Sequence, residues 1–281
     1  LWLLPCKGSA LPDWAKRPKL RNTIIFNFNI LKNLKTYFFS LIDYHKKVSY
    51  KTSIIIPCFN EEKTVYMVVS NICNQFQECK VIVVDDGSTD NSFIELKKIE
   101  SKNLNLIKLE NNQGKGNAMR KGLESIDDGS EIVIFTDADD EIDPKDIQKV
   151  LDKYEKDTDI VAVFGSRFKQ ISLSTIFKMG LHRYLANRFL TIVSNVIFNQ
   201  NLTDMETAVK SFRSYLIKDL NLISNGFDIE PEFVKELSRL NVKIDEVSID
   251  YEPRSVKDGK KISFKDGFIT LGYLINSRND W

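Results

Sequence analysis

The chain has 281 residues, of which 42% are hydrophobic and 28% charged, and its formal net charge is +1 at pH 7. This length and composition are sufficient to bury one substantial core. No uncharged run reaches 18 residues, so we expect no helix that spans a membrane. The four cysteines form no CxxC pair and have no histidine at metal-ligand spacing, which indicates buried thiols in a reducing, cytoplasmic compartment.

Charge is distributed unevenly along the chain. Residues 1–51 carry ten lysines and arginines against two acidic residues, so the remainder is net acidic. Residues 23–44 interleave aromatic and aliphatic side chains with lysines, a pattern typical of a helix at a membrane surface. A packing segment and a disordered leader remain alternatives, and we expect no nucleic-acid partner. We therefore predict a basic amphipathic extension over residues 1–51 and a folded domain over residues 52–281.

From residue 53 onward, strand and helix patterns alternate. Predicted strands lie at 53–57, 80–86, 103–110 and 131–139, and predicted helices at 61–76, 91–101 and 114–126. The run Val81–Val84 is apolar without alternation, as expected for a strand covered on both faces. The repeated strand-helix order predicts an α/β fold with a mostly parallel, doubly wound sheet and flanking helices.

The second half of the chain is less regular. A strand is predicted at 159–168, a helix at 226–240 and a last strand at 242–251, followed by a basic tail. Between them, residues 174–199 have the period of one long helix. Its apolar stripe consists of Phe177, Leu181, Leu185, Phe189, Ile192 and Val196. The stripe fits a core helix and an amphipathic interfacial helix equally well.

Polar residues follow several of the predicted strands, at the sheet edge where ligands of open α/β folds bind. Asp137 and Asp139 are two residues apart, so in an extended segment both side chains can address one ligand. Their oxygens suit Mg²⁺ or Mn²⁺, which commonly bridge carboxylates to phosphates. The glycines beside Lys115 permit close approach of a ligand at a helix start. Singly, each segment also fits an ordinary turn, helix cap or acidic loop.

Together these motifs resemble a known family. The segments SIIIPCFNEEKTV, VIVVDDGSTDNS, NQGKGNAMRKGLE and IFTDADDEIDP are similar, in that order, to glycosyltransferase family 2 on the GT-A fold. The segments VFGSRF, LTDMETAVKSFR, GFDIEPEF and YEPRSVKDGKKISFKDG resemble its dolichyl-phosphate mannosyltransferase-like branch. The resemblance covers about residues 52–274. It implies an inverting transferase that moves a hexose, mannose or glucose, from a GDP- or UDP-sugar.

The resemblance also implies which residues bind the nucleotide sugar. Those for the base and ribose are Pro57, Phe59, Asn60, Glu61, Asp85 and Asp86. Lys115 is a further donor contact. Arg167 would contact the diphosphate, and Arg183 would assist as a permanently charged phosphate partner.

The metal site implied by the resemblance is a DxD pair. Asp139 would be the direct metal ligand, and Asp137 would be divided between metal and sugar. Glu141 stands where the branch often has glutamine, so it is a candidate third ligand. The metal and Arg167 would stabilise the negative charge of the departing nucleoside diphosphate.

The acceptor decides whether a general base is needed. A polyprenyl phosphate is already an anion, and the cluster Arg254, Lys257, Lys260 and Lys261 suits such a group. A hydroxyl acceptor would require a base, for which Asp204 or Glu206 is the candidate. The same two acids also fit a cap or an ion pair with Lys210 or Arg213.

These considerations predict an enzyme peripherally associated with the cytoplasmic face of a membrane. A family 2 transferase acting on a glycan or lipid-linked saccharide hydroxyl is the main alternative. A sugar-1-phosphate nucleotidyltransferase is disfavoured because the first strand leads into PCFNEE rather than a GxGxR-type loop. A catalytically inactive nucleotide-sugar binding module is disfavoured by the intact DxD pair. Oligomeric state stays open.

Overall fold

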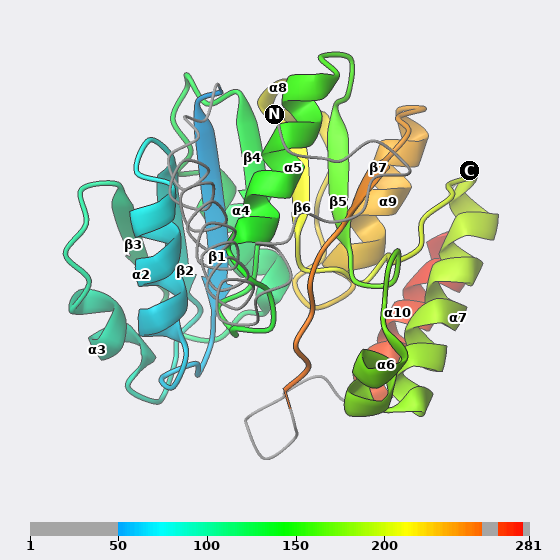
Figure 1. Cartoon of the computed structure of the whole chain (residues 1–281), viewed down its shortest axis with the longest axis horizontal. Coiled ribbons are helices and arrows are strands. Elements are labelled where there is room, and N and C mark those ends of the chain that lie inside the picture. Colours follow the sequence, from blue (N-terminus) through cyan, green and yellow to red (C-terminus); the bar gives the residue numbers. More distant parts are fainter. Residues whose placement is uncertain (1–49, 255–263, 278–281) are drawn as a thin grey trace, which may run out of the picture. The chain divides into compact units, whose positions relative to one another are not determined.

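The structure, a computed structural model, describes residues 50–254 and 264–277. The predicted extension over residues 1–51, except its last two residues, and Lys257, Lys260 and Lys261 lie outside the described residues. A seven-stranded sheet of order β3-β2-β1-β4-β6-β5-β7 forms the centre (Figure 1). The strands are β1 (Thr52–Cys58), β2 (Lys80–Asp85), β3 (Leu104–Lys108), β4 (Ile132–Phe135), β5 (Ala162–Ser166), β6 (Lys210–Arg213) and β7 (Asp245–Ser248).

Every pair in the sheet is parallel except those made by β6, which runs antiparallel to both β4 and β5. The predicted mostly parallel sheet is therefore confirmed. Strand β6 was missed because KSFR is short and polar, without an apolar run. Its formation depends on the neighbouring strands, since Val133 pairs with Phe212 and Val163 with Ser211.

Helices cover both faces of the sheet (Figure 1). They are α2 (Val65–Gln75), α3 (Ser92–Lys97), α4 (Lys115–Leu123), α5 (Lys145–Lys156), α6 (Leu173–Met179), α7 (Leu181–Phe198), α8 (Ser214–Asp219), α9 (Ile229–Arg239) and α10 (Phe264–Ser277). Ile54 and Ile56 pack with α2, α3 and α5, whereas Ile55 packs in the opposite core with α4, α7, α9 and α10. This two-sided burial explains the continuous apolar runs in the sequence.

The predicted helix over residues 174–199 is divided in two. Gly180 has φ of 92° and separates α6 from α7. This conformation costs glycine little, so the chain can turn there. Helix α10, within the basic tail, was not predicted; it packs against α7 and α9.

The apolar stripe of α6 and α7 faces solvent. All six of its side chains are between 54% and 80% exposed, so the interpretation as a core face is wrong. The buried face of α7 instead carries Leu190, Thr191, Ser194 and Phe198. No helix within the described ranges has the length and hydrophobicity needed to cross a bilayer.

Candidate active site

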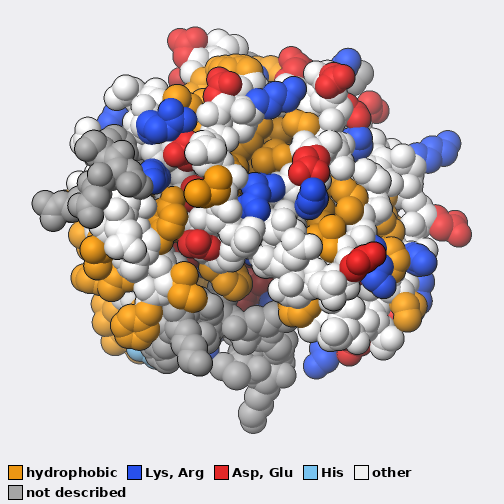
Figure 2. All heavy atoms as spheres, turned by 180° about the vertical axis from the view of Figure 1, so that it is seen from behind, with side chains coloured by type: hydrophobic (Ala, Val, Ile, Leu, Met, Phe, Trp, Pro, Cys, Tyr) orange, Lys and Arg blue, Asp and Glu red, His pale blue; other side chains and the backbone are white. Residues whose placement is uncertain are grey.

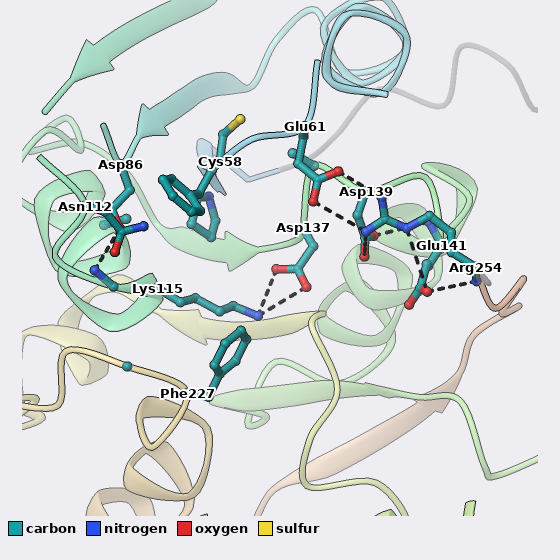
Figure 3. Close-up of a pocket in the computed structure, with 16 residues that line it drawn as sticks. Cys58, Glu61, Asp86, Asn112, Lys115, Asp137, Asp139, Glu141, Phe227 and Arg254 are labelled. Atoms are coloured by element: carbon teal, nitrogen blue, oxygen red, sulfur yellow. Dashed lines mark hydrogen bonds and ion pairs between the residues drawn. The ribbon is translucent and has the colours of Figure 1, made fainter. Parts of the chain in front are cut away.

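A cavity of about 380 Å³ lies at the carboxyl ends of β1, β2 and β4 (Figure 3). Its position follows from the parallel order of these strands, whose ends meet at one edge of the sheet. Nine predicted site residues line it: Pro57, Phe59, Glu61, Asp86, Lys115, Asp137, Asp139, Glu141 and Arg254. The cavity thus joins segments that are far apart in the sequence.

The loop before α4 is fastened to the end of β2 through Asp86. Its carboxylate accepts hydrogen bonds from the backbone N–H of Gln113 at 3.0 Å and of Gly114 at 2.7 Å. Burial raises the pKa of Asp86, and these two donors oppose the rise. Gly114 has φ of 103°, and a Cβ there would overlap the carbonyl oxygen of Asn225. The glycine is therefore needed for this wall of the cavity.

Two residues predicted to bind base and ribose do not line the cavity. Asn60, with φ of 53°, accepts a hydrogen bond from Thr89 N–H at 2.8 Å and so ties the loop after β1 to the loop after β2. Asp85 is 0% exposed, and neither of its carboxylate oxygens has a hydrogen-bond partner within the described residues. Asn60 thus shapes the site from outside the cavity lining.

Lys115 lies at the start of α4 and points across the cavity to the DxD segment (Figure 3). Its Nζ is 2.9 Å from Asp137 Oδ1 and 2.9 Å from Glu230 Oε1. Glu230 also pairs with Lys210, whose side chain is fully buried. Burial disfavours the charge of Lys115, but Asp137 and Glu230 outweigh it and raise its pKa above the ordinary range. One half of the DxD pair is therefore already neutralised by a lysine.

The other half of the DxD pair contacts Arg254. This half is Asp139, whose Oδ2 lies 2.9 Å from Arg254 Nη2; Arg254 Nη1 lies 2.8 Å from Glu61 Oε2. The backbone N–H of Arg254 donates to Glu141 Oε1 at 2.9 Å. Burial, together with Asp137 and Glu141, raises the pKa of Asp139 to about 7 even though Arg254 opposes the rise. Among the described residues, three acids thus meet one guanidinium.

The donor chemistry of this cluster fits a divalent cation. Asp137, Asp139 and Glu141 supply the hard carboxylate oxygens that Mg²⁺ and Mn²⁺ prefer. Within residues 50–254 and 264–277, no three His, Cys, Asp or Glu side chains are arranged to hold a metal ion directly. The guanidinium of Arg254 lies among the acids instead (Figure 3).

Arg167 and Asp204 form a buried pair that does not line the cavity. Arg167 Nε and Nη2 each lie 2.7 Å from an oxygen of Asp204, and the Arg167 backbone N–H donates to Asp204 at 3.0 Å. The acid therefore pairs with Arg167 rather than with the anticipated Lys210 or Arg213. Burial opposes the charge of Arg167, but Asp204 raises its pKa above the ordinary range. Tyr251 connects this pair to the cavity: its ring lies 5.4 Å from the guanidinium, and its hydroxyl donates to Glu141 at 3.1 Å.

Glu206 and Arg183 also lie outside the cavity lining. Burial, then Glu230 and Asp204, raise the pKa of Glu206 to about 7, while Lys210 and Arg167 lower it. Glu206 Oε1 is buried and has no hydrogen-bond partner among the residues that the structure describes. Arg183 is partly buried on α7.

Two residues of the site were not singled out from the sequence, and a third, Lys210, was predicted only as a partner of Asp204 or Glu206. Phe227 lines the cavity, and Lys115 Nζ lies 5.9 Å from its ring centroid. Glu230 and Lys210 complete the buried charge chain from Asp137. Phe227 and Glu230 belong to the segment GFDIEPEF. The acid Glu230 among apolar residues at the start of a helix was the signal in the sequence that could have indicated a site residue. The pairing of Lys210 with Glu230 was not predicted, because strand β6, which carries Lys210, was not predicted.

The sequence of this chain is similar to those of proteins from archaea and eukaryotes. An uncharacterized protein of Methanocaldococcus jannaschii is 31% identical, and the matched region covers 72% of this chain and 89% of that protein. The UDP-N-acetylglucosamine--dolichyl-phosphate N-acetylglucosaminyltransferase of Methanococcus voltae is 32% identical over 60% of this chain and 71% of that enzyme. The dolichyl-phosphate beta-glucosyltransferase of Saccharomyces cerevisiae is 26% identical, and the matched region covers 75% of this chain and 69% of that enzyme.

The fold is shared with a solved glycosyltransferase. Glucosyl-3-phosphoglycerate synthase from Mycobacterium tuberculosis, in complex with Mn²⁺, uridine diphosphate and phosphoglyceric acid, has a TM-score of 0.62 and 15% identity, covering 82% of this chain and 79% of that one. At this identity the similarity shows the GT-A fold alone. Residues 53–220 match the sequence model of the family described as Glycosyl transferase family 2. Because this match runs from β1 through α8, and because relatives named for dolichyl-phosphate transfer accompany it, this chain belongs to glycosyltransferase family 2.

Proposed function

We propose that this enzyme is an inverting, metal-dependent transferase that moves a hexose from a GDP- or UDP-sugar to a polyprenyl or dolichyl phosphate at the cytoplasmic membrane face. The observation that carries the proposal is the cavity in which Asp139, Glu141 and Arg254 meet at the carboxyl edge of the sheet. Relatives named for dolichyl-phosphate acceptors support the acceptor class. These relatives are named for N-acetylglucosamine and glucose, whereas mannose enters the proposal through the sequence motifs alone.

Within the cavity, donor binding is divided between its two sides. Pro57, Phe59, Glu61 and Asp86 would contact base and ribose, and Lys115 would lie beside the sugar and diphosphate. Asp139 and Glu141, with Asp137 adjacent, would hold Mg²⁺ or Mn²⁺. When bound, that cation supplies positive charge against the departing diphosphate. Asp139 and Glu141, held on the loop after β4, would orient that charge toward the diphosphate.

Transfer to a phosphate balances without a general base. An acceptor phosphate oxygen forms the new bond to the anomeric carbon, the bond from that carbon to the donor phosphate breaks, and its electron pair leaves on the nucleoside diphosphate. No proton has to be removed. Asp204, whose two carboxylate oxygens are both held by Arg167, is not positioned to accept one. This favours a phosphate acceptor.

A hydroxyl acceptor is the second candidate, and Glu206 supports it. Glu206 meets one requirement of a general base, since its pKa is raised to about 7 and one of its oxygens lacks a described hydrogen-bond partner. It lies outside the cavity lining, so a hydroxyl acceptor would have to reach it beyond the cavity. Under this alternative, Glu206→Gln abolishes transfer, whereas a phosphate acceptor leaves the variant active.

Membrane contact is supported by the exposed faces of α6, α7 and α10. Apolar side chains gather over these helices at the left and lower left of Figure 2. On α10, Phe268 is 73% and Ile275 57% exposed, beside the α7 stripe. Tyr251 packs on Met179 at the end of α6 and also contacts Glu141, so this face connects to the cavity. An interfacial helix with such a face would bring the site to a lipid head group.

Flotation with liposomes tests membrane contact. Leu185→Asp combined with Phe189→Asp should abolish co-flotation with vesicles of phosphatidylcholine and phosphatidylglycerol. The matched control is Ile94→Asp, because Ile94 is 57% exposed but lies on α3 in the other layer. Equal flotation of all three proteins would argue against this surface.

Product analysis tests the reaction. The protein is incubated with Mn²⁺, a panel of UDP- and GDP-sugars, and either a polyprenyl phosphate or a saccharide acceptor, and products are identified by mass spectrometry. We expect a glycosyl phosphate of the polyprenol and a free nucleoside diphosphate. A product glycosylated on a hydroxyl would establish the second candidate, and no transfer from any donor would refute both.

A further inference from the structure

Arg254 is held by acids that come from two separate segments of the chain, neither of which is its own. Glu61 follows β1, and Asp139 and Glu141 follow β4, while Arg254 itself follows β7. Its side chain is only 14% exposed. Nη1 and Nη2 bond to Glu61 and Asp139, and Nε lies 3.9 Å from Glu141 Oε1. An arginine in this position supplies part of the positive charge that a bound cation would supply.

The acids that contact Arg254 include those assigned to the metal. Asp139 Oδ2 is 2.9 Å from Arg254 Nη2, whereas a Mg²⁺ ion would need that oxygen at about 2.1 Å. A guanidinium and a divalent cation therefore compete for the same oxygens. Mutual repulsion of two cations in a partly buried site strengthens the competition.

Among the described residues, three carboxylates, those of Glu61, Asp139 and Glu141, face the guanidinium of Arg254. Asp137 takes no part in this contact, because it pairs with Lys115 on the other side of the cavity. A dication accompanied by the donor diphosphate would satisfy these carboxylates better than Arg254 does.

We propose that Arg254 is an internal competitor for the divalent cation, which occupies the metal's place in the free enzyme and is displaced when the metal and the donor diphosphate bind together. The inference rests on the proposed function and adds its regulation. Metal alone must displace Arg254 unaided and binds weakly, whereas metal with nucleotide binds well. The displaced guanidinium is then available to the anionic acceptor, so the donor binds before the acceptor. Coupling of this kind is reciprocal: Mn²⁺ strengthens nucleotide binding by the same factor.

The test is the affinity for Mn²⁺ in the absence of nucleotide, measured from the electron paramagnetic resonance signal of free Mn²⁺. Arg254→Gln should bind Mn²⁺ at least about tenfold more tightly than the wild type, because the competing charge is gone. Arg254→Lys keeps the charge and should stay near the wild type. Arg239→Gln is the matched control: Arg239 also pairs with a glutamate, Glu236, but outside the cavity lining.

A second titration separates competition from simple phosphate binding. With UDP or GDP present, the gain in Mn²⁺ affinity caused by the nucleotide should be large in the wild type and smaller in Arg254→Gln. Unchanged or weaker binding of Mn²⁺ alone by a folded Arg254→Gln protein, as judged by circular dichroism, would overturn the inference. Absence of Mn²⁺-dependent nucleotide binding in the wild type would instead overturn the proposed function, and tighter Mn²⁺ binding by Arg254→Gln would still support the competition.

Discussion

Removal of the Asp204 carboxylate leaves the buried guanidinium of Arg167 without its ion-pair partner. Asp204→Ala leaves Arg167, 11% exposed, without the acid that meets it at 2.7 Å through both Nε and Nη2. Each hydrogen bond to a charged group contributes about 1.5–3 kcal/mol. Breaking one partner of a buried pair costs about 3–5 kcal/mol, because the other charge remains desolvated. We therefore expect Asp204→Ala to lower the free energy of unfolding by about 3–5 kcal/mol.

Urea denaturation followed by circular dichroism measures this loss. A double-mutant cycle of Asp204→Ala and Arg167→Met isolates the pair: the double variant should be more stable than the single variant Asp204→Ala, since no uncompensated charge remains. If Asp204→Ala costs less than about 1 kcal/mol and the coupling energy is near zero, then the pair does not stabilise the fold and the reasoning is refuted.

The result also bears on the acceptor. Loss of activity in Asp204→Ala would follow from misplacement of Arg167 with either acceptor class. It therefore cannot identify Asp204 as a base. Glu206→Gln is the variant that discriminates, because Glu206 has no such arginine partner among the hydrogen bonds described.

Three further outcomes are expected. Because the folded protein holds the Glu206 proton more tightly than the unfolded chain does (pKa about 7 against an ordinary 4.5), wild-type stability should fall as pH rises through this interval. Glu206→Gln should remove that loss and be more stable than the wild type at pH 8 by on the order of 1–3 kcal/mol. Equal free energies of unfolding of the two proteins at pH 8, from urea denaturation, would contradict this. Gly114→Ala should lower the melting temperature through backbone strain of about 1–3 kcal/mol, whereas Gly267→Ala, with open space around it, should not. Asp139→Asn should weaken Mn²⁺-dependent nucleotide binding in calorimetry by at least about 100-fold, and wild-type affinity in this variant would exclude it as a ligand.

Much of the nucleotide half of the site could be predicted because its signals are local. Val81–Val84 identifies a strand covered on both faces, and Asp86 and Asp137 follow directly from the ends of such strands. Parallel order then brings these ends to one edge without further information. Glu61 and Lys115 also follow parallel strands of this sheet, and both line the cavity as this rule predicts.

The pairing of charges could not be predicted in this way. Arg254 and Glu61 are 193 positions apart, and Arg167 and Asp204 are 37 apart. Which arginine meets which acid depends on where β7 and the loop before β6 run in space. The sequence predicts Lys210 or Arg213 as the partner of Asp204, because both are near it in the chain. In the folded protein the partner is Arg167.

By itself, the sequence determined the order of strands and helices in the nucleotide half, the two-sided burial of the sheet and the acids at its ligand edge, because apolar periodicity and strand ends are properties of contiguous residues. Only the tertiary structure decided that the α7 stripe faces outward, since a helix with one apolar face has the same period whether that face is buried or exposed. It also decided that β6 runs antiparallel and that Arg254 sits among the acids assigned to a metal, because both depend on contacts between distant segments.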